Sequence, residues 1–329
     1  MPALPGGPIL DPAPLIPAGQ PAPESAEEDP MQKIVPNVWF QGNAAEGAEF
    51  YEHALPNTHM VDSANYPTEG LLEFQQDLAG ELLTAVLEIE GYRVLLINAG
   101  DEFTPNPAIS FLLNFDPSRD ENARTTLQRV WSRLSPGGTA LMPLDTYPFS
   151  EYYGWVQDRY GVSWQLMLTN PEGEPRPFIT PSLMFGGQAQ NHAKQAVEYY
   201  TGVFGDAKLG ALVPYADQTG PALPGNVMYS DFTVEDQWFS AMDSGVTQDF
   251  SFTPGVSLMV NCTDQDEIDR FWEALSAVPE AEQCGWCTDQ FGVSWQVVPV
   301  DTDDLMKQPG AFERMLTMKK LDIAQLRGD

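Results

Sequence analysis

The sequence predicts an α+β protein built from two tandem copies of one module. Two observations support this prediction: short motifs recur in the same order in both halves of the chain, and strand-like runs alternate with helical spacing in each half. The length of 329 residues agrees, because domains usually contain about 100 to 200 residues. We therefore expect two domains, each able to bury a sizeable core.

The repeat is strongest at the end of each copy. Residues 154–165 read GWVQDRYGVSWQ and residues 285–296 read GWCTDQFGVSWQ, with eight of the twelve positions identical. Residues 142–149, which contain two prolines, have no counterpart in the second copy, so we expect a surface loop there. Near the start of each copy, Ile34, Pro36, Phe40 and Gly42 recur as Ile179, Pro181, Phe185 and Gly187.

The first copy begins with a predicted strand and helix. Residues 35–41 alternate with period two, and residues 44–55 follow with helical spacing after Asn43, a residue type that caps helices. Two apolar runs then flank Glu90 and Gly91, which predicts a hairpin with a tight turn.

The rest of the copy repeats that order. A strand is predicted at 109–115, a helix at 119–134, and a hairpin that ends with 161–168. The order βαβββ is therefore expected twice within each copy. Trp164 and Trp295 alternate away from the neighbouring glutamines, so we expect them to pack in the core on the helix side.

Composition shifts mark the expected boundaries. The first 30 residues are rich in Pro, Ala, Gly and Glu without apolar periodicity, and are predicted to be a disordered leader. A second Pro-rich stretch reads as a linker. The predicted order is leader 1–30, module 31–169, linker 170–177, module 178–300 and helical tail 301–329.

The charge excludes one class of partner. The formal net charge is −31, from 16 basic and 47 acidic residues. Nucleic-acid affinity rests largely on basic residues that neutralise phosphates, so we expect no nucleic acid and no anionic membrane as partner. The acidic residues are spread along the chain, as on a solvated surface.

Nothing in the sequence predicts a membrane span or export. No apolar run approaches the roughly 20 residues that a bilayer crossing needs, and the N-terminus lacks the cationic start and apolar stretch of a signal peptide. We expect a cytoplasmic protein. Three cysteines cannot form a disulfide framework. Cys284 and Cys287 have the C-x-x-C spacing of a redox pair or half a zinc site, but three apart on a predicted strand they should point to opposite faces, which favours a structural role.

The chain resembles the PhnB-like branch of the glyoxalase/bleomycin-resistance superfamily, also called vicinal oxygen chelate proteins. Two features carry the resemblance: the repeated endings at 154–165 and 285–296, and the pairs Phe50-Tyr51 and Tyr199-Tyr200 on the predicted first helices. The resemblance covers about residues 33–300, and 315–326 resembles the short helix that such proteins carry after the module. It implies that paired βαβββ units form a cupped eight-stranded mixed sheet in each module.

The resemblance also implies a test for a metal. The superfamily's enzymes hold a divalent ion in the cup with His and Glu side chains, and an amide is a weak neutral ligand in comparison. We therefore expect no metal and no other cofactor. The corresponding positions here are Asn37 and Ser182, Ala108 and Gly255, and Gln165 and Gln296.

The branch often carries the name demethylubiquinone methyltransferase. Such an activity would require a glycine-rich turn between a parallel strand and its helix. The sequence Ser135-Pro-Gly-Gly138 follows a predicted helix instead, as a helix stop does. We therefore do not expect methyl transfer.

Side chains that alternate onto the inner face of each cup are the candidate ligand contacts. We expect a ligand to stack on Trp39 and to accept or donate hydrogen bonds at Asn37 and Gln165. The alternative is that these groups satisfy one another in a filled core. The candidates are Asn37, Trp39, Ser110, Asn114, Ser163 and Gln165 in the first copy, and Ser182, Met184, Ser257, Asn261, Ser294 and Gln296 in the second.

The predicted function is metal-independent binding or sequestration of a small hydrophobic or aromatic molecule, and a homodimer is compatible with it. One alternative is a metal-dependent lyase, isomerase or dioxygenase of the superfamily kind. Another is an interaction protein whose cups are packed cores, with the leader or residues 305–326 recruiting a partner.

Overall fold

The computed structural model describes residues 31–71 and 73–329. Residues Gln32–Asp329 form one compact unit, and the predicted leader lies outside the described residues. None of the helices in this part of the chain has the length and apolar composition to cross a bilayer.

Within residues 31–71 and 73–169, the first copy contains eight strands and two α-helices in the predicted order. Its first half ends with the predicted hairpin, and its second half ends with the Gly-Val-Ser-Trp-Gln strand. The elements are β1 (Ile34–Gln41), α1 (Ala44–Ala54), β2 (Thr58–Asn65), η1 (Glu73–Leu78), β3 (Leu82–Ile89), β4 (Tyr92–Ala99), β5 (Ile109–Phe115), α2 (Ala123–Leu134), β6 (Thr139–Tyr147), β7 (Ser150–Gln157) and β8 (Ser163–Leu168).

The second copy follows the same order with one strand fewer, and three short helices come after it. The elements are β9 (Ile179–Phe185), η2 (Gly187–Ala189), α3 (Ala193–Val203), β10 (Lys208–Pro214), β11 (Val227–Val234), β12 (Gln237–Asp243), β13 (Val256–Cys262), α4 (Gln265–Leu275), η3 (Pro279–Ala281), β14 (Trp286–Thr288), β15 (Ser294–Pro299), α5 (Thr302–Met306), α6 (Ala311–Leu316) and α7 (Ile323–Arg327).

Two local predictions need correction. Residues 142–149 are not a loop, because most of them belong to β6, which pairs with β7 at the edge of its sheet. Asn43 makes no side-chain cap. Asn98 on β4 accepts the N–H of Ala44 instead, at 3.0 Å, so the cap comes from a neighbouring strand.

The strands form two mixed sheets, which confirms the α+β fold of two tandem modules. Sheet A has the order β14-β15-β13-β1-β4-β3-β2, and sheet B has the order β10-β11-β12-β9-β5-β8-β7-β6. Sheet A thus has seven strands among the described residues and sheet B eight. In each sheet, antiparallel and parallel pairs alternate around the central strands.

Each sheet combines the first half of one copy with the second half of the other, whereas we expected the two halves of one copy to share a sheet. In sheet A, β1 pairs with β13, with Asn37 opposite Ser257. In sheet B, β5 pairs with β9, with Ser110 opposite Ser182. Strand alternation determines which face is buried, but it does not determine which half pairs with which, so the sequence pattern could not reveal this exchange.

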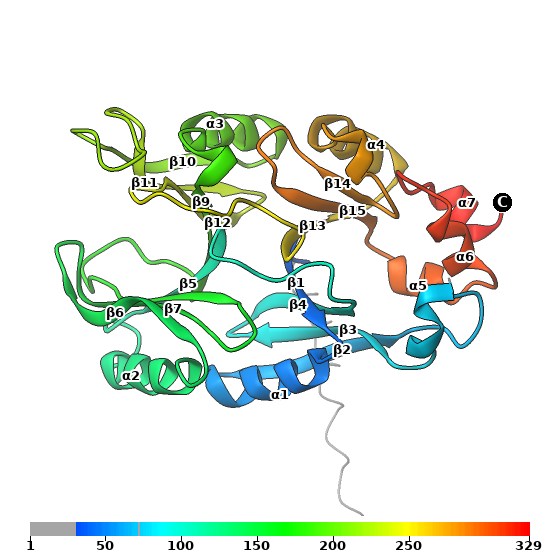
Figure 1. Cartoon of the computed structure of the whole chain (residues 1–329), viewed down its shortest axis with the longest axis horizontal. Coiled ribbons are helices and arrows are strands. Elements are labelled where there is room, and N and C mark those ends of the chain that lie inside the picture. The colour runs from blue at the N-terminus through cyan, green and yellow to red at the C-terminus, as the bar shows by residue number, and fades with distance from the viewer. Residues whose placement is uncertain (1–30, 72) are drawn as a thin grey trace, which may run out of the picture. The chain divides into compact units, whose positions relative to one another are not determined.

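The helices cover one face of each sheet and leave the other face turned inward (Figure 1). Helix α2 packs on β7 and β8, and α3 packs on β11 and β12, on the outer side of sheet B. The same strand alternation holds in sheet A, where Val38 and Phe40 of β1 point into the helix-side core. We call the inner face of sheet A cup A and the inner face of sheet B cup B.

One hydrophobic core, rather than one core per copy, extends over both copies. Two buried clusters with the same arrangement stabilise it. Asp158, in the β7–β8 turn, accepts hydrogen bonds from the Tyr51 hydroxyl at 2.8 Å and from Trp164 Nε1 at 2.9 Å. It also accepts the N–H groups of Tyr160 and Val162. Because α1 covers sheet A and β8 belongs to sheet B, this carboxylate links the two sheets.

The second copy reproduces the cluster around Asp289. The Tyr200 hydroxyl donates to it at 2.7 Å and Trp295 Nε1 at 2.8 Å. Trp164 and Trp295 are each 2% exposed, which confirms their predicted core position. The aspartate, the tryptophan and the glycine-containing turn of the repeated motif therefore have a structural role.

We predict that Tyr51→Phe lowers the free energy of unfolding by about 1–3 kcal/mol, because a buried carboxylate loses one charged hydrogen bond. Tyr200→Phe should have a similar effect, and urea unfolding measures both. Tyr152→Phe is the matched control, since the Tyr152 hydroxyl only accepts a hydrogen bond from the exposed Gln128. Equal losses in Tyr51→Phe and Tyr152→Phe would contradict the role of the cluster.

Candidate functional site

The structure distributes the predicted contact residues over both cups. Asn37 and Trp39 lie in cup A, whereas Gln165 lies in cup B, so the predicted ligand site formed by these three residues does not exist. The reason is the exchange of half-sheets. Cup A contains Asn37, Trp39, Ser257, Asn261, Ser294 and Gln296, and cup B contains Ser110, Asn114, Ser163, Gln165, Ser182 and Met184.

A chain of hydrogen bonds forms the floor of cup B. The Tyr153 hydroxyl donates to Gln165 Oε1 at 2.7 Å, and Gln165 Nε2 donates to Ser110 Oγ at 2.8 Å. Ser182 is opposite Ser110 in register, and Ser240 is opposite Ser182. Ser240 is fully buried and its hydroxyl has no hydrogen-bond partner in the structure. The floor is therefore polar but uncharged.

Apolar side chains line the wall of cup B. Leu112, Tyr153, Trp155 and Met184 form a buried cluster of their own, separate from the helix-side core. Thioethers and aromatic rings suit flat apolar molecules, because methionine adapts its shape and contacts rings favourably. Met142, Tyr147, Met167, Met242 and Phe250 pack around this cluster.

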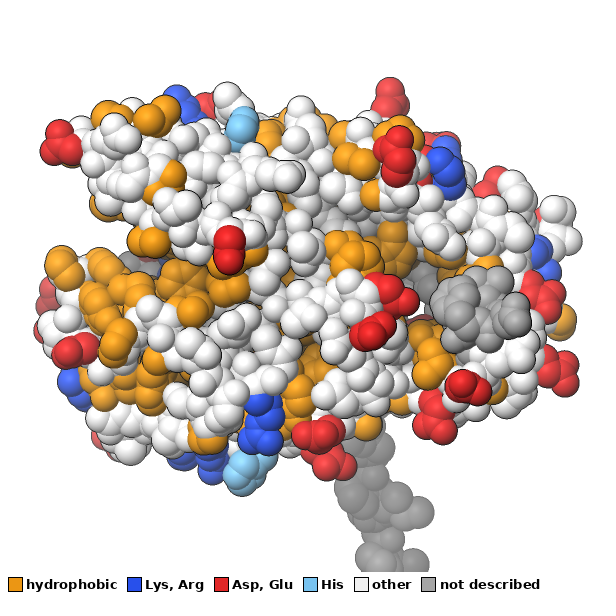
Figure 2. All heavy atoms as spheres, viewed as in Figure 1, with side chains coloured by type: hydrophobic (Ala, Val, Ile, Leu, Met, Phe, Trp, Pro, Cys, Tyr) orange, Lys and Arg blue, Asp and Glu red, His pale blue; other side chains and the backbone are white. Residues whose placement is uncertain are grey.

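The mouth of cup B is open. Phe149 is 61% exposed at its rim, stacks on Tyr147 at 5.6 Å between ring centroids, and meets Tyr153 edge-on. Figure 2 shows a hollowed groove on this side of the molecule, with hydrophobic side chains on its walls. An exposed apolar concavity of this kind is a common binding surface.

Sequence reasoning missed Tyr153, Trp155 and Ser240 of cup B. It also missed Arg176 of the predicted linker. Its guanidinium pairs with Asp231 of β11 at 2.8 Å and lies 3.8 Å over the Trp238 ring of β12. The Tyr229 hydroxyl donates to the same carboxylate at 3.3 Å. A lone arginine in a Pro-rich stretch was the only signal in the sequence. Arg176 also pairs with the exposed Glu174 at 2.7 Å, so both carboxylates neutralise this guanidinium and leave no free cation among the described residues of this wall.

Cup A has a related floor with fewer hydrogen bonds. Gln296 Nε2 donates to Ser257 Oγ at 3.0 Å, as Gln165 does to Ser110. Asn37 is 2% exposed, and its Oδ1 has no hydrogen-bond partner. Trp39 is partly exposed and meets Trp286 edge-on at 6.2 Å between ring centroids. The repeat places Cys284 where the first copy has Tyr153, so Gln296 Oε1 receives no tyrosine hydroxyl.

Three of the predicted contact residues make hydrogen bonds that fix neighbouring parts of the chain. Asn114 Nδ2 donates to the carbonyl of Pro177 at 2.9 Å, and Asn261 Nδ2 donates to the carbonyl of Gln32 at 3.0 Å. Both asparagines therefore position the segment that enters a first strand. Ser163 Oγ accepts the indole N–H of Trp155 at 2.7 Å.

The residues at the superfamily's metal positions do not fit a divalent ion. The Gln165 amide already makes hydrogen bonds with Tyr153 and Ser110. Asn37 Oδ1 has no partner, but a single neutral amide oxygen is a weak metal ligand. Ala108 is 1% exposed in the packed crossing between the two sheets. Across 31–71 and 73–329, no three His, Cys, Asp or Glu side chains converge as a metal site would require.

The three cysteines are free, and their surroundings disfavour the thiolate. Burial raises the pKa of Cys287 to about 12 and also raises the pKa of Cys284. The thiolate is the reactive form of cysteine. These pKa directions agree with a structural role for the C-x-x-C sequence.

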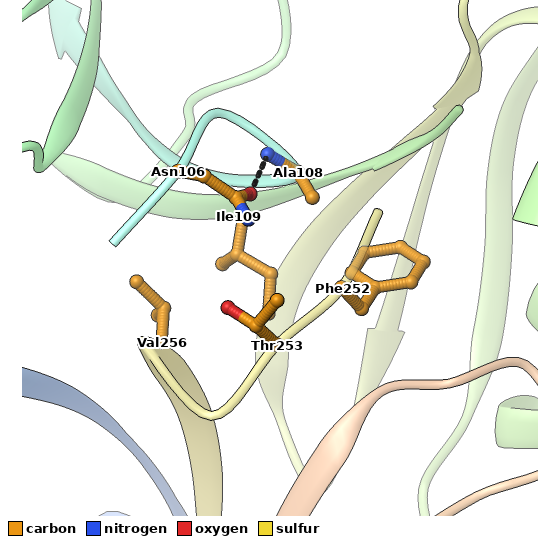
Figure 3. Close-up of a pocket in the computed structure, with 6 residues that line it drawn as sticks. All are labelled: Asn106, Ala108, Ile109, Phe252, Thr253 and Val256. Atoms are coloured by element: carbon orange, nitrogen blue, oxygen red, sulfur yellow. Dashed lines mark hydrogen bonds between the residues drawn. The ribbon is translucent and has the colours of Figure 1, made fainter. Parts of the chain in front are cut away.

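Two further hollows in the described residues are too small for a ligand. One lies where β5 and β13 begin, lined by Asn106, Phe252 and neighbouring side chains, and has essentially no free volume (Figure 3). The Asn106 side chain accepts the N–H of Ala108 there at 2.9 Å. The other, beside Tyr200 and Trp295, has a cavity volume of about 10 Å³, the size of a single water at most.

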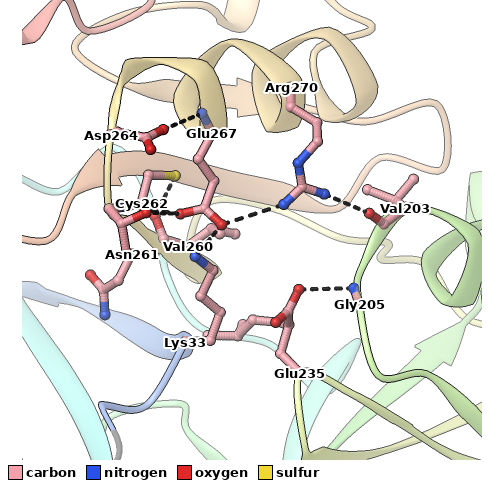
Figure 4. A network of polar contacts seen from close by, with 12 residues as sticks. Lys33, Val203, Gly205, Glu235, Val260, Asn261, Cys262, Asp264, Glu267 and Arg270 are labelled. Carbon is pink, nitrogen blue, oxygen red and sulfur yellow. Dashed lines mark hydrogen bonds and ion pairs between the residues drawn. The ribbon is translucent and has the colours of Figure 1, made fainter.

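A polar cluster outside both cups joins the two copies. Lys33, just before β1, pairs with Glu267 of α4 at 2.6 Å, and Arg270 donates to the carbonyl of Val203 (Figure 4). Burial opposes the charge of Glu267, but hydrogen bonds from Lys33 and Thr263 hold its pKa below the usual value. The Lys33 contact attaches the first strand to the second copy, and the Arg270 contact joins α4 to α3 within the second copy.

The sequence matches the profile of the family described as 3-demethylubiquinone-9 3-methyltransferase. The match covers residues 32–167 and again 177–298, which together make up well over half of the chain. The chain belongs to this family. Because the family's model matches twice along the chain, the chain contains two tandem modules of this family. A comparison with curated proteins gives no significant match.

Several solved structures are similar to this chain over one module or more. A putative 3-demethylubiquinone-9 3-methyltransferase, PhnB protein, from Bacillus cereus is 30% identical, over 42% of this chain and 100% of its own, with a TM-score of 0.35. Protein PA1353 from Pseudomonas aeruginosa is 23% identical over 42% of this chain and 98% of its own, with a TM-score of 0.34. Glyoxalase I from Zea mays is 15% identical over 83% of this chain and 93% of its own, with a TM-score of 0.48.

We predict that Gln165→Leu destabilises the protein more than Gln296→Leu does. The first change leaves the buried hydroxyls of Tyr153 and Ser110 without partners and should cost about 1–3 kcal/mol. The second change removes one hydrogen bond only and should cost about 1 kcal/mol or less. Urea unfolding of both variants provides the comparison, and the reverse order would contradict the hydrogen-bonded floor of cup B.

Proposed function

We propose that the protein binds a small, neutral, flat apolar molecule in cup B and that it does so without a metal. The observation that carries the proposal is the composition of this cup. Its wall consists of thioethers and aromatic rings, and its floor consists of an amide and hydroxyls that are already oriented by one another. Binding pockets for small molecules commonly combine an apolar lining with a few fixed polar groups.

The electrostatics support a neutral ligand. Arg176 is paired with both Asp231 and Glu174, so an anionic ligand finds no free cation among the described residues of that wall, and the buried Asp231 carboxylate is already occupied. The formal net charge of −31 additionally disfavours an anion. Stacking on the wall and one or two hydrogen bonds at the floor remain as the forces that recognise a ligand.

Methyl transfer, the activity in the family's description, is not part of the proposal. Cofactors that carry groups of this kind bind at glycine-rich turns between a strand and its helix. The strand-to-helix turn after β1 has a single glycine, Gly42, and β5 is followed by Asp116-Pro117. The turn after β9 has two glycines, Gly186 and Gly187, which do not make up the three-glycine pattern of such turns. Sequestration of a ligand by the cup requires no such turn.

The test is isothermal titration of the whole protein with 1-naphthol, with 1-naphthalenesulfonate as the charged counterpart. We expect saturable binding of the naphthol and much weaker binding of the sulfonate. Phe149→Ser should weaken naphthol binding about 2- to 10-fold, since it removes one aromatic contact of about 0.5–1.5 kcal/mol at the rim.

Met60→Ser is the matched control for this experiment. Met60 is 49% exposed on β2 of sheet A, so its loss should leave the affinity of cup B unchanged. Adding Ni²⁺, Zn²⁺ or Mn²⁺ should also leave the affinity unchanged. The proposal fails if naphthol does not bind, if Met60→Ser and Phe149→Ser act alike, or if binding depends on one of the ions.

A further inference from the structure

The C-terminal segment 302–327 packs on the inner face of sheet A. Leu305 and Leu321 of this segment are buried in one cluster with Val298 of β15, and Met259 of β13 packs against it. Val298 follows Val297, which points into the helix-side core, so Val298 points to the opposite face. The segment therefore lies in cup A.

The segment reaches from one edge of sheet A to the other. At the β14 edge, the N–H groups of Cys284 and Gly285 donate to the carbonyls of Met318 at 2.8 Å and Lys319 at 2.7 Å. At the β2 edge, Asp303 of α5 faces Asp62. Figure 1 shows α5, α6 and α7 beside sheet A, while the described residues place no such segment on the corresponding side of sheet B.

The loop beyond β2 also touches the segment. A side chain at Gly70 would come within 2.6 Å of the Glu313 carboxylate, so α6 lies directly against this loop.

The second copy explains why the segment fits here. In sheet B, β6 pairs with β7, with Asp145 opposite Tyr153. The second copy lacks this strand, and the position equivalent to Tyr153 is Cys284, where Met318 binds instead. The C-terminal segment thus takes up an edge position that β6 occupies in the other sheet.

Several groups on the inner face of sheet A have the character of an incomplete binding site. Asn37 has a buried amide oxygen without a partner, and a buried polar group in this state is unusual. Trp39 and Trp286 offer rings beside the amide, and Gln296 is fixed by Ser257. An aromatic molecule with a hydroxyl or N–H donor would supply the missing hydrogen bond.

We propose that cup A is a second site for a neutral aromatic molecule with a hydrogen-bond donor, and that the C-terminal segment is its removable cover. The proposal rests on the proposed function of cup B, because the two floors are related by the repeat. It predicts one ligand per chain while the segment is in place and two when the segment is released.

The contacts that hold the C-terminal segment on sheet A allow the segment to be released. Its helices have only five or six residues each, and Met306, Met315 and Met318 supply flexible contacts. Burial and the charge of Asp62 raise the pKa of Asp303, while Lys307 lowers it and Asp304 raises it further. Because the covered state binds the Asp303 proton more tightly than the released state, low pH favours the cover, and this contribution is lost as the pH rises through the raised pKa.

Tryptic cleavage of the full chain measures the cover independently of any ligand. The segment offers cleavage sites at Lys307, Arg314, Lys319, Lys320 and Arg327. Leu305→Ala removes a buried anchor and should speed cleavage there about tenfold or more. Asp303→Asn removes the repulsion from Asp62 and should slow the cleavage at neutral and alkaline pH.

Leu134→Ala is the matched control for the cleavage experiment. Leu134 is as deeply buried as Leu305 but lies on α2, away from the segment. If Leu134→Ala accelerates cleavage of the segment as much as Leu305→Ala, the effect comes from global unfolding and the cover is refuted. If neither change at Leu305 nor at Asp303 alters the rate, the cover is refuted as well.

Titration with 1-naphthol then counts the sites. We expect one per chain in the wild type, two in Leu305→Ala, and one again in Leu305→Ala/Asn37→Leu. A single site in Leu305→Ala despite faster cleavage would overturn the second site. No binding in the wild type but one site in Leu305→Ala would support the covered site while contradicting the function proposed for cup B.

Discussion

The structure depends on two antiparallel strand pairs, β1 with β13 and β5 with β9, which join the two copies. Through these pairs, neither sheet belongs to one copy, and the hydrophobic core continues across both. The backbone N–H and C=O groups along these edges need the partner strand, because a buried backbone group without a hydrogen bond costs free energy. Each copy therefore completes the sheets of the other.

The exchange has a direct consequence for the cups. A floor glutamine from one copy always meets a first strand from the other, so Gln165 shares its cup with Ser182, and Gln296 shares its cup with Asn37. Differences between the copies then make the cups unequal. Cup B has Tyr153, Arg176 and an open aromatic rim, whereas cup A lacks the tyrosine and lies under the C-terminal segment.

The two buried aspartates show how the sheets are held at a fixed separation. Asp158 and Asp289 each accept a tyrosine hydroxyl from a first helix and an indole N–H from a last strand. In each copy, the first helix packs on one sheet, whereas the last strand belongs to the other sheet. Each cluster therefore spans the junction between the two sheets. These clusters and the covalent continuity of the chain hold the two sheets together in addition to the strand pairs.

Much of this architecture was visible in the sequence. The repeat predicted two related modules, and the period-two alternation predicted that Trp164 and Trp295 face the core, as they do. The same alternation placed Gln165 on an inner face. Patterns of this kind report which side of a strand is buried, and they hold whatever the pairing of the halves.

The features that could not be predicted depend on contacts between segments that are far apart in the sequence. The pairing of Asn37 with Gln165 was wrong because register says nothing about which half-sheet is the neighbour. Residues 142–149 were expected as a loop because of their prolines, yet prolines are tolerated at a sheet edge, where β6 lies. Arg176 could not be placed in cup B without knowing that Asp231 and Trp238 face it.

Cutting the chain between the copies tests the shared sheets most directly. A site for a sequence-specific protease in place of residues 171–174 leaves Arg176 and every strand intact. After cleavage, the two fragments should elute together in gel filtration and unfold in urea as one cooperative transition. Fragments that separate under native conditions and unfold independently, each with its own sheet, would contradict the exchange of half-sheets.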